Sequence, residues 1–128
     1  MEVKFYRCRK CGNIIMKIVD SGVTPICCGE PMLMMKYNTV DASQEKHVPA
    51  IVEIDNRSMK VQVGSKEHPM EPEHHIAFIA LETESGVQIS RLKEGSGPHA
   101  CFCFRSKPKA VYEYCNIHGL WKKDVSDG

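Results

Sequence analysis

The segment "YEYCNIHGLW", residues 112–121, places Cys115 and His118 close together near the end of the chain. A thiolate and an imidazole separated by two residues can bind one metal ion, because both are common metal ligands in proteins. Two ligands do not complete a metal site. The segment therefore predicts further cysteine or histidine ligands elsewhere in the sequence, and a fold that brings them to this turn.

The chain has the composition of a globular protein, with 128 residues, a formal net charge of +1 and an apolar fraction of 42%. This length suits one domain, or a domain with a small module. No run of about 18 apolar residues is present and the N-terminus lacks a secretory signal pattern, so we expect a cytoplasmic protein without a membrane span. The scattered charges give no electrostatic basis for binding nucleic acid or membranes.

Cysteine is the unusual part of the composition. Seven cysteines are present, and in a reducing compartment they favour metal thiolates over disulfides. Four come early, as "CRKC" at 8–11 and "CC" at 27–28, and four sulfurs suit zinc or iron. We expect residues 1–37 to form a metal module, because so short a unit cannot bury enough apolar surface unaided. The backbone must twist between Cys27 and Cys28, since adjacent side chains in an extended chain point apart.

Residues 38–128 read as a second domain of short strands punctuated by turn-forming residues. Alternating or apolar runs predict the strands 48–54, 59–63, 75–82, 86–92, 100–105 and 109–115. This pattern is typical of an antiparallel sandwich of immunoglobulin-like type, so the fold class is mainly β.

Histidines near turns and predicted strand ends are the candidates for the missing ligands. The candidates that accompany Cys115 are His47, His68, His74 and His118. Several imidazoles with one thiolate suit iron, copper or zinc. Because neutral imidazoles carry no charge, the thiolate offsets only part of the metal's charge, and such a centre attracts an anion.

Five segments resemble a known family. "EKHVP" (45–49), "HPMEPEHHI" (68–76) and "EYCNIHGLWK" (113–122) are similar to the signature segments of the superoxide reductases. "CRKCGN" (8–13) and "CCGEPM" (27–32) resemble the desulforedoxin-like module that precedes the neelaredoxin-like domain in the two-iron members, the desulfoferrodoxins.

The resemblance implies two irons per chain. One is held by four cysteines, where zinc is the other candidate: Cys8, Cys11, Cys27 and Cys28. The catalytic iron is held by four histidines and an axial cysteine, with its sixth position open: His47, His68, His74, His118 and Cys115. It also implies a homodimer that reduces superoxide to hydrogen peroxide, in antioxidant defence, with electrons from a rubredoxin-like donor.

Two loop residues carry over from "EKH". Lys46 resembles the family lysine near the open iron position, and Glu45 resembles the glutamate that coordinates the oxidised iron. Taken without the family, the two are an exposed charge pair. His75 stands where family members often carry a tryptophan. Because neighbours in a strand face opposite sides, only one of His74 and His75 should reach the iron, and the register favours His74.

Other interpretations stay open beside a reductase. Cys101 and Cys103 belong to neither ligand set, and we expect them to be buried core thiols, with a redox or dimer-linking role as the alternative. The whole chain could also be a non-catalytic electron carrier that uses the four-cysteine iron, or a zinc-stabilised binding module. An open coordination position favours the enzyme, because a carrier needs none.

Overall fold

The computed structural model describes residues 2–38, 47–64, 68–93 and 95–125, and it divides the chain into two compact units, Met1–Lys36 and Tyr37–Gly128. Tyr37 falls in the second unit because it forms a bridge with Leu120, one residue before the boundary expected from the sequence. No helix among the described residues has the length and apolar character needed to cross a membrane.

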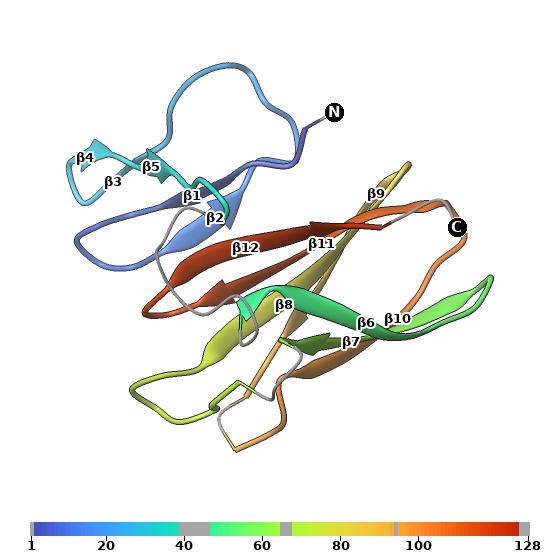
Figure 1. The fold of residues 1–128 in the computed structure, drawn as a ribbon. Helices are drawn as coiled ribbons and strands as arrows, with labels where there is room; N and C mark the ends of the chain where they lie inside the picture. The colour runs from blue at the N-terminus through green and yellow to red at the C-terminus, as the bar shows by residue number, and fades with distance from the viewer. Residues whose placement is uncertain (1, 39–46, 65–67, 94, 126–128) are drawn as a thin grey trace. The chain divides into compact units, whose positions relative to one another are not determined.

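The first unit is built from short antiparallel strands. Two small sheets have the orders β2-β1-β5 and β3-β4 (Figure 1). Their strands are β1 (Phe5–Arg7), β2 (Ile14–Met16), β3 (Ile26–Cys27), β4 (Glu30–Pro31) and β5 (Leu33–Met34). One buried apolar cluster of the unit contains Tyr6, Cys8 and Met32, and Phe5 is buried as well. So small a core agrees with the expectation that a metal supplies part of the folding free energy.

The second unit is an antiparallel β-sandwich, as the sequence predicts. One sheet has the order β10-β7-β6 and the other has the order β12-β11-β8-β9 (Figure 1). The strands are β6 (Pro49–Ile54), β7 (Ser58–Val63), β8 (Ile76–Thr83), β9 (Gly86–Arg91), β10 (His99–Cys103), β11 (Pro108–Cys115) and β12 (Gly119–Asp124).

Alternating apolar side chains join the two sheets. Val61 of β7 and Phe102 of β10 lie in the same buried cluster as Leu81 of β8 and Val111 of β11. In a strand every second side chain faces the same side, so the neighbours of each of these residues along its strand point away from the space between the two sheets. Burial of this shared apolar face is the main force that holds the sheets together.

Two expectations differ from the structure. The strand β12 was not predicted, because "GLWKKD" has only two adjacent apolar residues and shows no alternation. Cys101 and Cys103 are exposed, so the prediction that they are core thiols is wrong. Ala100 and Phe102 occupy the inward positions of β10, and the alternation therefore turns both thiols outward.

Candidate metal centres

The predicted histidine and cysteine ligands converge at one end of the sandwich. His47 lies two residues before β6, and His68 follows β7 in the same sheet. In the other sheet, His74 precedes β8, Cys115 ends β11, and His118 precedes β12. Each of the five residues offers one donor atom, and these atoms all lie within 4.8 Å of one another. Both sheets therefore contribute to a single cluster, which we call the His4Cys cluster.

The four imidazoles form a square. Neighbouring ring centroids are 4.8 Å apart for His47 and His68, 4.6 Å for His68 and His74, 5.1 Å for His74 and His118, and 4.5 Å for His118 and His47. The diagonal from His47 to His74 is longer, at 6.4 Å. Neighbouring rings are steeply inclined, at 74° to 82°. Four nitrogens in a square with one thiol differ from the tetrahedral set of structural zinc.

Two distances test whether the cluster fits a metal ion. His47 Nε2 and His118 Nδ1 are 2.8 Å apart, and two ligands at right angles with bonds of about 2.1 Å would be separated by about 3 Å. Nε2 of His68 is buried and has no hydrogen-bond partner among the described residues. Its Nδ1 lies 2.7 Å from the carbonyl oxygen of Pro69, so Nδ1 carries the proton and Nε2 offers a lone pair.

Burial favours the neutral forms of His68 and Cys115. It lowers the pKa of His68 to about 4, so this imidazole is unprotonated at neutral pH and competent to bind metal. Burial also raises the pKa of the Cys115 thiol. The amide N–H of His118, 3.4 Å from the sulfur, acts in the opposite direction. A bound cation reverses the balance, because a thiol that coordinates a metal loses its proton.

A bulge in β8 decides which of two adjacent histidines faces the cluster. Ladder pairing runs regularly from Ala110 and Glu82 to Tyr114 and Phe78 and then shifts, so that Cys115 pairs with Ile76. Ile76 is fully buried beside Cys115, and alternation from this residue turns His75 outward and His74 inward. The ring of His75 instead lies 3.0 Å from the carbonyl oxygen of Glu71. The structure thus places His74, and not His75, in the cluster.

Trp121 supports the square from the side. Its ring stacks on that of His47, with centroids 5.1 Å apart and planes 23° apart. Its indole N–H donates to the carbonyl oxygen of His118 over 3.2 Å. One fully buried side chain therefore contacts two neighbouring members of the cluster.

The four early cysteines form a second cluster in the first unit. Their sulfur atoms all lie within 4.8 Å of one another. The sulfurs of Cys11 and Cys27 are 3.6 Å apart and those of Cys27 and Cys28 are 4.0 Å apart. A tetrahedral ion with bonds of about 2.3 Å would separate its sulfur ligands by about 3.8 Å. Cys28 has φ of 53°, which is the backbone twist that lets adjacent cysteines reach one point.

The close packing of these thiols gives them different pKa values. The amide N–H of Cys11 lies 3.4 Å from the sulfur of Cys8 and lowers the pKa of Cys8 to about 6. Hydrogen bonding with the neighbouring thiols, Cys11 first, raises the pKa of Cys28 to about 12. Four negative charges at this separation repel one another, so a metal cation is needed for all four to ionise at neutral pH.

Several other residues complete the comparison with the sequence. Glu45 and Lys46 lie outside the described residues. Glu113 was missed: it is fully buried two residues before Cys115 on the same strand face, and burial raises its pKa well above the usual value. Its carboxyl oxygens have no hydrogen-bond partner among the described residues. A charged residue at an inward position of the apolar run "AVYEYC" is the signal that could have revealed it.

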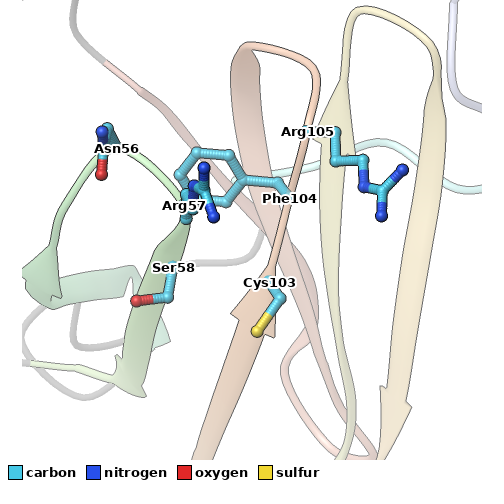
Figure 2. Close-up of a pocket in the computed structure, with 6 residues that line it drawn as sticks. All are labelled: Asn56, Arg57, Ser58, Cys103, Phe104 and Arg105. Atoms are coloured by element: carbon cyan, nitrogen blue, oxygen red, sulfur yellow. The ribbon is translucent and has the colours of Figure 1, made fainter.

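A pocket of about 620 Å³ lies at the opposite end of the sandwich, by the turn between β6 and β7. Figure 2 shows its lining, with the Cys103 thiol on one strand and Ser58 on the other. None of the predicted metal ligands lines this pocket. The reactive chemistry predicted from the sequence is therefore at the other end of the unit.

Fold and sites together define a class: a mainly-β protein with two separate metal-binding clusters, one of four thiols and one of four imidazoles with a thiol. Residues 39–124 match the family model described as Desulfoferrodoxin, and residues 1–35 match the model described as Desulfoferrodoxin, N-terminal domain. The chain belongs to the desulfoferrodoxin family, which confirms the resemblance seen in the sequence.

Individual relatives agree with this membership. A desulfoferrodoxin of Syntrophotalea carbinolica is 42% identical over 96% of this chain and 97% of its own length. A superoxide reductase of Thermococcus kodakarensis is 38% identical over 74% of this chain and 98% of its own length. The crystal structure of the superoxide reductase from Treponema pallidum covers 97% of this chain and 100% of its own, with 32% identity and a TM-score of 0.81.

The two clusters predict independent metal occupancy. The purified protein should hold about two metal ions per chain, whereas the Cys115→Ser and Cys11→Ser variants should each hold about one, because each lacks one thiolate ligand. Elemental analysis with protein quantification measures this. Cys103→Ser, which alters a thiol outside both clusters, is the control and should retain both ions. Full metal content in Cys115→Ser would contradict the assignment of the His4Cys cluster.

Proposed function

We propose that the chain is a superoxide reductase of the two-iron kind, which converts superoxide, one electron and two protons into hydrogen peroxide. The observation that carries the proposal is the square of four imidazoles with a thiol as the fifth donor, all within 4.8 Å. Five donor residues make up this set among the described residues, and a metal ion that prefers six ligands would keep one position for a small substrate. Relatives that carry the name superoxide reductase support the same activity.

Iron bound by the His4Cys cluster would supply the electron that superoxide takes up, and an external donor would restore the ferrous state. The protein's part is electrostatic and geometric. Four neutral imidazoles and one thiolate leave a ferrous ion with a net positive charge, which attracts an anionic substrate. Burial of Cys115 and His47 excludes water from the side of the thiol and fixes the ligands in place.

The neighbours of the ligands hold them in one arrangement. The carbonyl oxygen of Pro69 fixes the ring orientation of His68 and sets its tautomer. Trp121 holds the ring of His47 by stacking and holds the backbone of His118 by the hydrogen bond from its indole N–H. Ligands preorganised in this way lose little free energy to reorganisation when charge develops on the substrate.

Lys46 and Glu45 complete the proposed site by their similarity to family residues. The ammonium group of Lys46 would attract superoxide and donate a hydrogen bond to the developing peroxide. The carboxylate of Glu45 would coordinate the oxidised iron once peroxide has left. Both directly precede His47 in the sequence, and this adjacency to a member of the cluster supports the proposal.

The four-cysteine cluster has a separate role in the proposal. Its ligand set suits iron, which makes it an electron-transfer centre, and zinc is the alternative that leaves it purely structural. We propose that a rubredoxin-like carrier supplies electrons to a cytoplasmic homodimer. A colourless protein that contains zinc alone would support a binding module, and a protein with only the absorption of the four-cysteine iron would support an electron carrier.

The reductase activity itself can be tested directly. Reduced protein should consume superoxide and form hydrogen peroxide without releasing dioxygen. His47→Ala should lower the rate at least about 100-fold, because loss of a ligand should cost no less than loss of a ligand's hydrogen-bond partner, which costs up to about 100-fold. Pulse radiolysis with peroxide and oxygen detection measures this. His99→Ala, which alters a histidine outside the cluster, is the matched control. Release of dioxygen in proportion to superoxide consumed would show dismutation instead.

Lys46 should act through its charge. We expect Lys46→Ala to slow the reaction with superoxide about tenfold at low ionic strength, and less at high ionic strength, because salt screens the attraction of the anion. The second-order rate measured at several salt concentrations tests this. Lys60→Ala, at an exposed position of β7, is the control. An equal loss at every salt concentration would rule out electrostatic attraction.

Glu45 should act only after the chemical step. The Glu45→Ala variant should react with superoxide at the rate of the unaltered protein, because the carboxylate binds only oxidised iron in this proposal. The visible absorption of its oxidised centre should change, since one ligand is lost. Glu53→Ala, an exposed carboxylate of β6, is the control. An unchanged spectrum in Glu45→Ala would remove this residue from the site.

A further inference from the structure

Asn116 joins the two turns that carry three ligands of the His4Cys cluster. It lies between Cys115 and His118, and its side-chain oxygen accepts a hydrogen bond of 2.8 Å from the backbone N–H of His75. Its side-chain N–H donates over 3.1 Å to the carbonyl oxygen of Glu73, and its backbone N–H donates over 3.2 Å to the carbonyl oxygen of His75. Three hydrogen bonds from one residue therefore bracket His74, the residue between these two partners.

The turn that carries His74 is closed on itself. Glu71 and His74 exchange two backbone hydrogen bonds, of 3.0 Å and 3.1 Å. The ring of His75 lies 3.0 Å and 3.1 Å from the carbonyl oxygens of Glu71 and Pro72. Internal closure makes residues 71–75 a small rigid piece, but it does not fix where that piece lies against the end of β11. The backbone N–H and the side chain of Asn116 make that connection beyond the end of the β8–β11 ladder, and the side chain supplies two of the three hydrogen bonds.

The orientation of the Asn116 amide follows from its partners. A backbone N–H must donate and a carbonyl oxygen must accept, so the oxygen of the amide faces His75 and its nitrogen faces Glu73. Asn116 is exposed, so its amide could bond to water instead. Both ends of the amide bond instead to backbone groups that flank the ligand His74. This arrangement is expected of a residue that sets the position of a ligand.

We propose that Asn116 is a positioning residue that fixes His74 against Cys115 and His118, and so sets the metal affinity and electronic structure of the His4Cys centre. The inference rests on the proposed function only in taking iron as the bound metal. Asn116 contacts neither metal nor substrate in this role. It acts by holding two ligand-bearing turns at one separation.

Asn38 provides a matched control for a purely structural role. Its side chain makes the same pair of bonds to backbone, accepting from the N–H of Lys122 over 2.9 Å and donating to the carbonyl oxygen of Lys122 over 3.2 Å. These bonds bracket no ligand. Asn38 has φ of 55°, so alanine there adds backbone strain and makes Asn38→Ala a demanding comparison for stability.

The test compares Asn116→Ala with Asn38→Ala in the full, iron-loaded chain. For Asn116→Ala we expect the His4Cys centre to bind iron about tenfold more weakly than in the unaltered protein. Competition with a chelator measures this affinity. We also expect the EPR signal and visible absorption of its ferric form to change. The four-cysteine iron has a different ligand set and its own signals, so it is an internal reference that should stay constant. Asn38→Ala should match the unaltered protein in iron affinity and spectra at both centres, even if its urea midpoint falls further than that of Asn116→Ala.

A second variant separates position from folding. Asn116→Asp keeps the size and the acceptor for His75 but loses the donor to Glu73, so its affinity and spectrum should lie between those of Asn116→Ala and the unaltered protein. Unchanged affinity and EPR signals in both variants would overturn the proposal. So would loss of the folded sandwich in both, which would make Asn116 a structural residue. If the unaltered protein binds iron but does not reduce superoxide, the proposed function fails, while these spectra still decide the role of Asn116.

Discussion

The convergence of five donor atoms at one end of a two-sheet sandwich is the constraint on which the site depends. His47 and His68 come from one sheet, and the other three ligands come from the second sheet. Such a cluster is costly without a cation, since buried polar atoms such as Nε2 of His68 lose water and gain no partner. A metal ion removes that cost and links the sheets. Ligand binding and sandwich closure are therefore parts of one equilibrium in this unit.

The alternation of side chains along β11 and β8 determines which residues face the His4Cys cluster. Inward alternation along β11 runs through Val111 and Glu113 to Cys115, so the same period that builds the core also aims the thiol. The bulge opposite Cys115 resets the phase of β8 by one residue and turns His74 inward. A regular ladder would have placed His75 there instead. The site is thus a product of core packing and one local irregularity.

Residue type and spacing were enough to predict the mainly-β sandwich and the four-cysteine set, because thiol ligands are chemically distinctive and strand alternation is local. The second set of ligands followed from the resemblance to the family, which selected His74 over His75. Local pattern could not reveal β12, whose two buried apolar residues, Leu120 and Trp121, are adjacent in sequence. It also could not set the phase of β10, where Phe102 takes the core position and leaves Cys103 exposed. The link from Asn116 to the turn that carries His74 joins segments 41 and 43 residues apart. Contacts of that kind depend on the tertiary structure and have no signature in a single sequence.

The stacking of Trp121 on His47 has an optical consequence. Trp121 is the one tryptophan in the sequence, and its ring centroid lies 5.1 Å from that of a ligand. An iron ion bound to that ligand would quench indole emission at such short range. The chain therefore carries an intrinsic fluorophore beside one centre, whose brightness reports the filling and emptying of that centre without any added dye.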